Sequence, residues 1–329
     1  MTHPLRLPTL DDVREAAAAI APHAVRTPLL ESQFLNERIG VRVLVKAEVL
    51  QRTGSFKFRG AYNCVSRIDP AIYPGGAVAC SSGNHAQGVA EAARICGIPA
   101  VIVMPADAPA IKVERTRRSG AQIVLYDRHR EDRDAIAAAI SADRKMAFVA
   151  PFDNFHVIAG QGTVGLELVE QAKAIGAELE AVLVPASGGG LTAGMALAVT
   201  SAMPDARVYT VEPEGFDDYA RSLKSGVRES NPPGARSICD ALLMSQPGEL
   251  TFAMNKDRLA GGLAVSDDEV RAAVAFAFTE LKLVVEPGGA AALAALLSGH
   301  YLPSEAPVAV VLSGGNIDRP ILVQSLGPA

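Results

Sequence analysis

Short apolar segments alternate with alanine-rich segments along almost the whole chain. The segments between the apolar runs have the composition of helices, for example residues 91–96, 132–140, 165–175 and 267–281. Short, nearly continuous runs of valine, isoleucine and leucine separated by helices are typical of a parallel sheet that is covered on both faces. We therefore predict a doubly wound α/β fold with mostly parallel sheets flanked by helices. The runs expected to be strands are residues 41–47, 77–80, 100–104, 122–126, 181–184, 207–211 and 308–312.

The length of the chain sets the expected number of domains. With 329 residues and about 150 residues in a typical domain, the chain is long enough for two. Residues 69–76 and 148–154 are the weakest joints in the pattern. We predict that a small domain of residues 75–151 is inserted into a large domain made of residues 1–74 and 152–329.

Composition and charge exclude several classes of function. The net charge of −5 provides no basic field that would attract nucleic acid. No apolar run approaches the roughly 18 residues of a membrane span, and residues 1–8 lack the pattern of an export signal. The four cysteines form no CxxC pair of a zinc or redox site. We expect a cytoplasmic protein that acts on a small molecule, with neither nucleic acid nor a membrane as a partner.

Four turns rich in glycine or serine follow strands or open helices. In the first, QRTGSFKFRGAYN at residues 51–63, Lys57 stands between Phe56 and Phe58. An amine with apolar neighbours loses its proton more easily than a solvated one, as covalent catalysis by lysine requires. The alternative is a surface lysine whose stem covers the two rings.

The second turn, CSSGNHAQG at residues 80–88, directly follows a predicted strand. Ser81, Ser82 and Asn84 place hydroxyl, amide and backbone donors at a helix N-terminus, where anions bind. The alternative is a capped turn with a structural histidine, His85.

The third turn, PASGGGLTAG at residues 185–194, contains three consecutive glycines whose N–H groups can close around a phosphate. The fourth, LSGGNID at residues 312–318, places Ser313 after the last apolar strand. Ligands of open α/β sheets bind at this carboxyl edge of the strands.

The third turn also supports a rival interpretation. Gly188, Gly190 and Ala193 satisfy GxGxxA, and Glu212 at the end of the next strand would be the ribose-binding acid of a dinucleotide site. An NAD-dependent oxidoreductase would leave Lys57 and Ser313 without a task. A single phosphorylated cofactor would use all four turns, and we favour it.

The segments SFKFRGAYN, SSGNHAQG, SGGGLTAG and LSGGN, in this order, resemble the pyridoxal-phosphate enzymes of the threonine dehydratase and serine racemase family. The resemblance extends from about residue 25 to residue 318. It implies fold type II, with a large and a small domain, an active site between them, and a homodimer.

The resemblance implies a role for each matching residue. Lys57 would bind the cofactor covalently, Phe56 would border its ring and Asn84 would hydrogen-bond its phenolic oxygen. Ser313 would meet the pyridine nitrogen. The phosphate would be held by Ser187, Gly188, Gly189, Gly190 and Leu191, and the substrate carboxylate would be received by the turn Ser81, Ser82, Gly83, Asn84 and His85. Glu286, in VVEPGGAAA, resembles a family position near the cofactor and would equally serve as an acid that opens a helix.

The resemblance also places a metal site in VEPEGFDDY. Its ligands would be Glu212, the carbonyl of Phe216 and Asp218, which belong to the branch of serine racemase and 3-hydroxyaspartate dehydratase. Carboxylate and carbonyl oxygens suit Mg²⁺, or Ca²⁺ or Mn²⁺ in its place. The alternative is an acidic, solvated loop.

Two residues bear on the substrate and the reaction. Ser82 stands where many plain threonine dehydratases have alanine, and the equivalent hydroxyl of the racemases is an acid and base on the face opposite the lysine. Arg133 would contact a second carboxylate, as in 3-hydroxyaspartate. The alternative is that Arg128, Arg130 and Arg133 pair with neighbouring acids on an exposed helix face.

The expected activity is that of an ammonia-lyase. Lys57 would remove the α-proton of a β-hydroxy amino acid, the hydroxyl would leave, and hydrolysis would give the 2-oxo acid and ammonia. The substrate would be 3-hydroxyaspartate, or L-threonine or L-serine. The alternative on the same site is a serine or aspartate racemase with Lys57 and Ser82 as its two bases.

Overall fold

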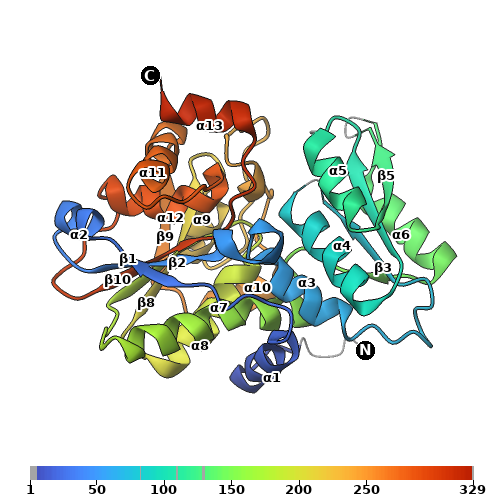
Figure 1. The fold of residues 1–329 in the computed structure, drawn as a ribbon, viewed down its shortest axis with the longest axis horizontal. Helices are drawn as coiled ribbons and strands as arrows, with labels where there is room; N and C mark the ends of the chain where they lie inside the picture. The colour runs from blue at the N-terminus through green and yellow to red at the C-terminus, as the bar shows by residue number, and fades with distance from the viewer. Residues whose placement is uncertain (1–5, 82, 109, 128–129, 328–329) are drawn as a thin grey trace.

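The computed structural model of the chain describes residues 6–81, 83–108, 110–127 and 130–327. Within these ranges the chain forms a six-stranded sheet and a four-stranded sheet. In Figure 1 the small sheet and its helices form the right-hand part of the molecule, and the large sheet lies on the left. No helix among the described residues is both long and apolar enough to cross a membrane.

The large sheet has the strand order β1-β2-β10-β7-β8-β9. Its neighbouring strands are parallel, except that β1 runs antiparallel to β2. The strands are β1 (Leu29–Glu31), β2 (Val43–Ala47), β10 (Val308–Leu312), β7 (Ala181–Pro185), β8 (Arg207–Pro213) and β9 (Gly261–Val265).

The small sheet has the order β5-β4-β3-β6, and all of its strands are parallel. The strands are β5 (Gln122–Tyr126), β4 (Ala100–Pro105), β3 (Ala77–Cys80) and β6 (Ala147–Phe148). They all lie within the segment expected to form the small domain, whose boundaries at residues 75 and 151 stay a prediction.

Helices cover both sheets. The α-helices are α1 (Leu10–Ile20), α2 (Gln33–Ile39), α3 (Lys57–Val65), α4 (Asn84–Cys96), α5 (Ala110–Arg118), α6 (Arg133–Arg144), α7 (Phe155–Ala174), α8 (Gly190–Ala202), α9 (Asp218–Ser225), α10 (Glu249–Asn255), α11 (Asp267–Thr279), α12 (Pro287–Leu297) and α13 (Arg319–Leu326). Three short 3-10 helices are η1 (Glu48–Leu50), η2 (Arg52–Gly54) and η3 (Asp240–Leu242). The predicted fold class is confirmed.

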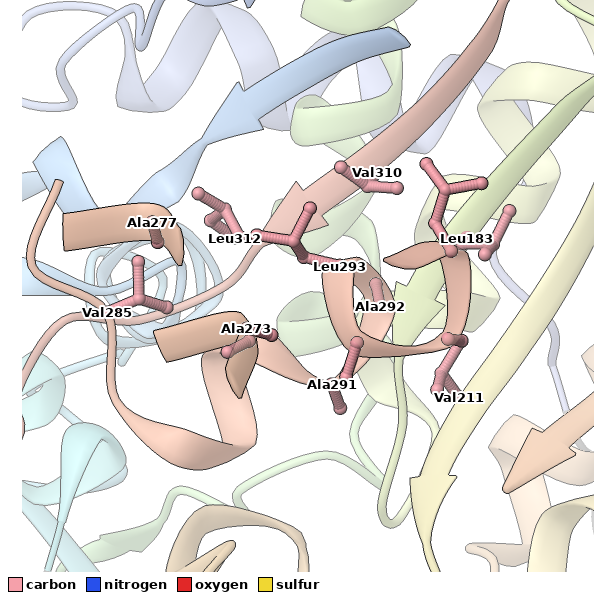
Figure 2. Packing of buried hydrophobic residues seen from close by; sticks show 14 of the residues in the cluster. Leu183, Val211, Ala273, Ala277, Val285, Ala291, Ala292, Leu293, Val310 and Leu312 are labelled. Carbon is pink, nitrogen blue, oxygen red and sulfur yellow. The ribbon is translucent and has the colours of Figure 1, made fainter. Parts of the chain in front are cut away.

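The large sheet is apolar on both faces because successive side chains of a strand point to opposite sides. On β10, Val308, Val310 and Leu312 pack against one core, whereas Ala309 and Val311 pack against the other. Figure 2 shows the first core, in which Val310 and Leu312 face side chains of α11 and α12. The second core contains α7 and α8. Burial on both faces explains the continuous apolar runs in the sequence.

A largely buried cluster of four charged side chains ties α3 to the large sheet. The Arg59 guanidinium on α3 pairs with Glu48 at 2.8 Å and with Glu167 of α7 at 2.7 Å. Lys46 of β2 pairs with Glu167, also at 2.7 Å. Arg59, Lys46 and Glu48 are fully buried. Because Lys57 is the first residue of α3, this cluster helps to fix the position of the lysine.

Candidate active site

A cavity of about 330 Å³ lies between the two sheets, at the carboxyl ends of β3, β7 and β10. All four turns singled out in the sequence contribute to its walls. The predicted residues that line it are Phe56, Lys57, Ser81, Gly83, Asn84, His85, Arg133, Ser187, Gly188, Gly189, Gly190, Leu191 and Ser313. Ser82 lies outside the described residues. The position agrees with the expectation that ligands bind at the carboxyl edge of parallel strands.

Lys57 extends into this cavity from the start of α3. The backbone N–H of Phe56 donates to the carbonyl of Ser313 at 3.1 Å, which joins the first turn to the fourth. The Lys57 ammonium donates to the carbonyl of Pro151 at 2.7 Å. Burial lowers its pKa to about 8, against the opposing effect of the Glu286 carboxylate. A larger fraction of this amine is therefore uncharged and nucleophilic near neutral pH than of an ordinary, solvated lysine.

The glycine-rich turn from Ser187 to Leu191 connects β7 to α8. Gly189 is the N-cap of α8 and has a φ of +91°, a conformation that side chains rarely adopt. A Cβ at Gly188 would overlap the ring of Phe152, and a Cβ at Gly189 would overlap the phenol of Tyr219. The turn is thus shaped for close approach of a ligand to backbone N–H groups at a helix N-terminus, which suits a phosphate.

The serine-containing turn connects β3 to α4. The Ser81 hydroxyl accepts from the N–H of Gly83 at 3.1 Å. His85 is buried, and its Nε2 lies 2.8 Å from the carbonyl of Val149. Burial, with the nearby Lys57 charge, lowers the His85 pKa to about 3, so the imidazole is neutral at physiological pH. These contacts are those of a structural anchor for the turn.

The side chain of Asn84 is held in one orientation. Its amide donates to the Glu286 carboxylate, and its carbonyl oxygen accepts from Asn316 at 2.7 Å. Asn316 also donates to the carbonyl of Thr53 at 2.8 Å. Glu286 occupies the N-cap position of α12, where its side chain makes no capping hydrogen bond, and it also lines the cavity. Asn316 was missed, although it lies in the fourth turn.

The arginines after β5 are not equivalent. Arg133, the first residue of α6, lines the cavity, and its side chain is 41% exposed with Nε 3.7 Å from Asp134. Arg130 is 85% exposed and lies 3.6 Å from Asp127. Arg128 falls outside the described residues. Arg133 alone among the described arginines of this segment lines the cavity, and it also pairs with Asp134, one of the neighbouring acids of the alternative. Arg130 is exposed and pairs with Asp127.

The predicted metal ligands are not among the residues that line the cavity. Glu212 is fully buried, and its carboxylate accepts from the N–H groups of Tyr219 at 3.0 Å and Ala220 at 2.9 Å. Burial, together with the charge of Asp218, raises its pKa well above the usual value. Burial also raises the pKa of Asp218 to about 6.

One carboxylate oxygen of Asp218 bears on whether the predicted metal ligands suit a cation. Asp218 Oδ2 is buried and has no hydrogen-bond partner among the described residues. Two buried carboxylates with such an oxygen fit a cation that prefers oxygen ligands. The described residues contain no cluster of three or more His, Cys, Asp and Glu side chains that could hold a metal ion. The third predicted ligand, the Phe216 carbonyl, is a backbone group and is not counted in such a cluster, so the metal site stays a prediction.

Glu212 also bears on the dinucleotide interpretation. Both of its carboxylate oxygens accept N–H groups at the start of α9. The acid therefore stabilises a helix N-terminus instead of presenting a free carboxylate to a ribose. This removes one of the two features on which the NAD alternative depended.

Several cavity residues were missed by the sequence analysis. Pro151 and Phe152 come from the chain that returns from the small sheet, and residues 240–244 come from η3 and the loop after it. Phe152 lies in a segment that the sequence marked only as a joint. Residues 240–244 carry no local pattern that would have identified them.

Three comparisons with known proteins bear on the family of the chain. The family model described as "Pyridoxal-phosphate dependent enzyme" matches residues 20–314. An L-threo-3-hydroxyaspartate ammonia-lyase of Saccharomyces cerevisiae is 41% identical over 314 residues, 95% of this chain and 94% of the yeast protein. A serine racemase of Schizosaccharomyces pombe is 39% identical over 320 residues, 97% of each chain.

The fold is shared with solved structures as well. The crystal structure of the T.th. threonine deaminase has a TM-score of 0.89 and 44% sequence identity, and the match covers 94% of this chain and 99% of that one. The lysine, the glycine-rich turn and Ser313 line one cavity. The chain belongs to the family of pyridoxal-phosphate-dependent enzymes.

Proposed function

We propose that this protein is an ammonia-lyase that removes water and then ammonia from a β-hydroxy amino acid and so produces a 2-oxo acid. The observation that carries the proposal is the position of the Lys57 amine in one cavity with the glycine-rich turn and Ser313, where burial also lowers its pKa to about 8. Relatives named as ammonia-lyases of 3-hydroxyaspartate and of threonine support this class of reaction.

Each of the proposed cofactor-binding residues would contact a different part of the cofactor. Pyridoxal phosphate, when bound, withdraws electrons from the α-carbon of the attached amino acid. Lys57 would hold the cofactor and later accept the α-proton at its Nζ. The N–H groups of the turn from Ser187 to Leu191 would bind the phosphate, and Phe56 would border the ring. Ser313, an uncharged hydroxyl that lines the cavity, would face the ring nitrogen.

The substrate would lie on the side of the small sheet. The turn from Ser81 to His85 would bind its α-carboxylate through backbone and hydroxyl donors, and Asn84 would hydrogen-bond the phenolic oxygen of the cofactor. Arg133 would bind a second carboxylate with two parallel N–H donors. This arrangement favours 3-hydroxyaspartate, with threonine and serine as the alternative substrates.

A divalent cation, Mg²⁺ or in its place Ca²⁺ or Mn²⁺, would bind to Glu212, the Phe216 carbonyl and Asp218. The unpartnered Asp218 oxygen supports this assignment. Because these residues are not part of the cavity wall, the cation would act by fixing the start of α9, and it would not touch the substrate.

A racemase remains the second candidate, because the S. pombe relative carries that name. It requires an acid and base opposite Lys57, and Ser82 is the proposed residue. Elimination and racemisation begin with the same proton removal by Lys57. They diverge afterwards, because elimination expels the β-hydroxyl whereas racemisation returns a proton to the opposite face of the α-carbon.

The test is the release of ammonia and 2-oxo acid from L-threonine, L-serine and both diastereomers of 3-hydroxyaspartate, with Mg²⁺ and with a chelator. We expect release from at least one substrate, stimulation by Mg²⁺, and no turnover by the Lys57→Ala variant, which should also lose the visible absorbance of the bound cofactor. Inverted product without ammonia would establish the racemase. Full activity of Lys57→Ala would refute both.

Two structural proposals accompany this function. The division into a large domain of residues 1–74 and 152–329 and a small domain of residues 75–151 is supported by the separate sheets. The homodimer rests on the family resemblance alone, and sedimentation of the purified chain tests it.

A further inference from the structure

The glycine-rich turn is held from the side that faces away from the cavity. The hydroxyl of Thr251, a fully buried residue of α10, donates to the carbonyl oxygen of Gly188 at 2.6 Å. The N–H of Gly248 donates to the same oxygen at 3.2 Å. Tyr219, also fully buried, closes the space behind Gly189. The turn thus packs against α9 and α10.

Helix α10 is itself fixed in place by Asp153. The Asp153 carboxylate accepts from the N–H groups of Glu249 at 3.0 Å, Leu250 at 2.9 Å and Thr251 at 3.1 Å. Asp153 follows Phe152, whose ring packs against Gly188. The carboxylate therefore satisfies three N–H groups of the first turn of α10 and holds Thr251 at a defined distance from Gly188.

The contact with Thr251 determines the direction of one peptide group. In a trans peptide, the carbonyl and the following N–H point in opposite directions. The carbonyl of Gly188 points toward α10, so the N–H of Gly189 points to the other side, where both glycines line the cavity. A reversed peptide would turn the carbonyl oxygen toward the same space.

Glycine makes such a reversal accessible. It adopts positive and negative φ with similar ease, and Gly189 has a φ of +91°. A phosphate is attracted by an N–H group and repelled by a carbonyl oxygen. The glycines that make room for a phosphate therefore also allow the peptide to turn its carbonyl oxygen toward the phosphate and repel it. Another residue is needed to hold the peptide in the orientation in which the N–H faces the cavity.

We propose that Thr251 is a positioning residue for the cofactor phosphate: its hydroxyl holds the peptide between Gly188 and Gly189 with the N–H toward the cavity. The inference deepens the proposed function and rests on the binding of the phosphate by this turn. Thr251 does not line the cavity, so it acts only through the backbone.

The test compares the affinity of the full-length chain for pyridoxal 5′-phosphate with its affinity for pyridoxal, which lacks the phosphate. Thr251→Val removes the hydroxyl and keeps the shape, whereas Thr251→Ser keeps the hydroxyl. Thr210→Val is the matched control, because Thr210 on β8 is fully buried and its hydroxyl has no hydrogen-bond partner among the described residues.

We expect Thr251→Val to weaken binding of pyridoxal phosphate about fivefold, the effect of losing the shorter of the two hydrogen bonds to the Gly188 carbonyl while the Gly248 N–H still donates to it. Its affinity for pyridoxal should stay within about twofold of the unmodified chain, because the covalent bond to Lys57 and the ring contacts are unchanged. Thr251→Ser should restore most of the affinity for pyridoxal phosphate. Thr210→Val should change neither affinity.

Equal weakening of both ligands by Thr251→Val, or no weakening of either, would overturn the inference. If Thr251→Val does not fold, Thr251→Ala replaces it, with circular dichroism as the check on folding. Failure of the unmodified chain to bind either ligand would instead contradict the proposed function, so the two failures are distinguishable.

Discussion

The turn after β7 and the turn after β3 both connect a parallel strand to a helix, and both line the cavity. Their surroundings differ. Added Cβ atoms at Gly188 and Gly189 would overlap Phe152 and Tyr219, whereas one at Gly83 would meet no atom within 4 Å. The first turn is therefore packed into its shape before a ligand arrives, and the second has open space beside it.

This difference matches the roles proposed for the two turns, one toward the cofactor phosphate and the other toward the substrate. The cofactor is always the same, so a preformed site for its phosphate reduces the entropy that is lost on binding. The substrate must enter and leave in every catalytic cycle, and the reaction needs space on its side of the cavity. We infer that cofactor affinity depends mainly on the packed turn and substrate selection on the open one.

The largest expected effect comes from adding a methyl group to each turn. Gly189→Ala forces an L-residue into positive φ and against Tyr219 and should weaken pyridoxal phosphate binding by about a hundredfold. Gly83→Ala should change that affinity by less than about threefold, and instead raise the KM for substrate. Equilibrium dialysis of the holoenzyme measures the first quantity and steady-state kinetics the second. An equal loss of cofactor affinity in Gly189→Ala and Gly83→Ala would contradict the difference inferred between the two turns.

A smaller effect is expected for Arg133 on the open side. Arg133→Ala should lower kcat/KM for 3-hydroxyaspartate about tenfold, because the proposed charge-assisted contact from the half-exposed Arg133 side chain to the second carboxylate is lost. The value for serine should hardly change. Arg130→Ala is the control, since Arg130 is exposed and pairs with Asp127. A similar loss of kcat/KM for both substrates would mean that Arg133 does not bind the second carboxylate.

The smallest expected effect concerns Glu286, which lines the cavity and accepts a hydrogen bond from Asn84 of the turn after β3. Its negative charge raises the Lys57 pKa, so Glu286→Gln should lower that pKa below about 8. More of the amine is then uncharged at pH 7, and the cofactor-free chain should react with pyridoxal phosphate about twofold to threefold faster. Visible absorbance, followed from pH 6.5 to 9, measures the rate. Glu280→Gln, a change at an exposed residue, should leave the midpoint of the pH dependence of this rate unchanged. A midpoint that moves to higher pH in Glu286→Gln would contradict the effect assigned to Glu286 on the Lys57 pKa.

The sequence predicted those parts of the fold that leave a local pattern. Strands such as β7 and β10 are buried on both faces, so nearly every residue in them is apolar. Strand β9 was missed because it begins with Gly261 and Gly262, which are typical of turns. A Cβ at Gly262 would overlap Ala220 of α9, so packing by a distant helix requires glycine there. Strands β1 and β6 are too short to show a pattern.

The same distinction applies to the site. The turns around Lys57 and Ser313 were visible because each is contiguous in the sequence. Thr251 was not, because it acts on Gly188 from 63 residues away, and an isolated threonine in a helix carries no local indication of its partner. Phe152 is a similar case. Residues that pack against a turn on the side away from the cavity are far from it in the sequence. Their contact with the turn exists only in the folded chain, so no local sequence pattern predicts it.

The buried charge cluster of Lys46, Glu48, Arg59 and Glu167 restricts how this protein can change. Replacing one member leaves an uncompensated charge in the interior, at a cost of about 3–5 kcal/mol, a large part of the 5–15 kcal/mol that stabilises a typical domain. Because Arg59 contacts two carboxylates, replacing Arg59 together with only one of them still leaves the other carboxylate without this partner, and the loss of stability remains. In a laboratory selection that varies one position at a time, these four positions should return the starting residue, and only a library that varies them together would find an alternative.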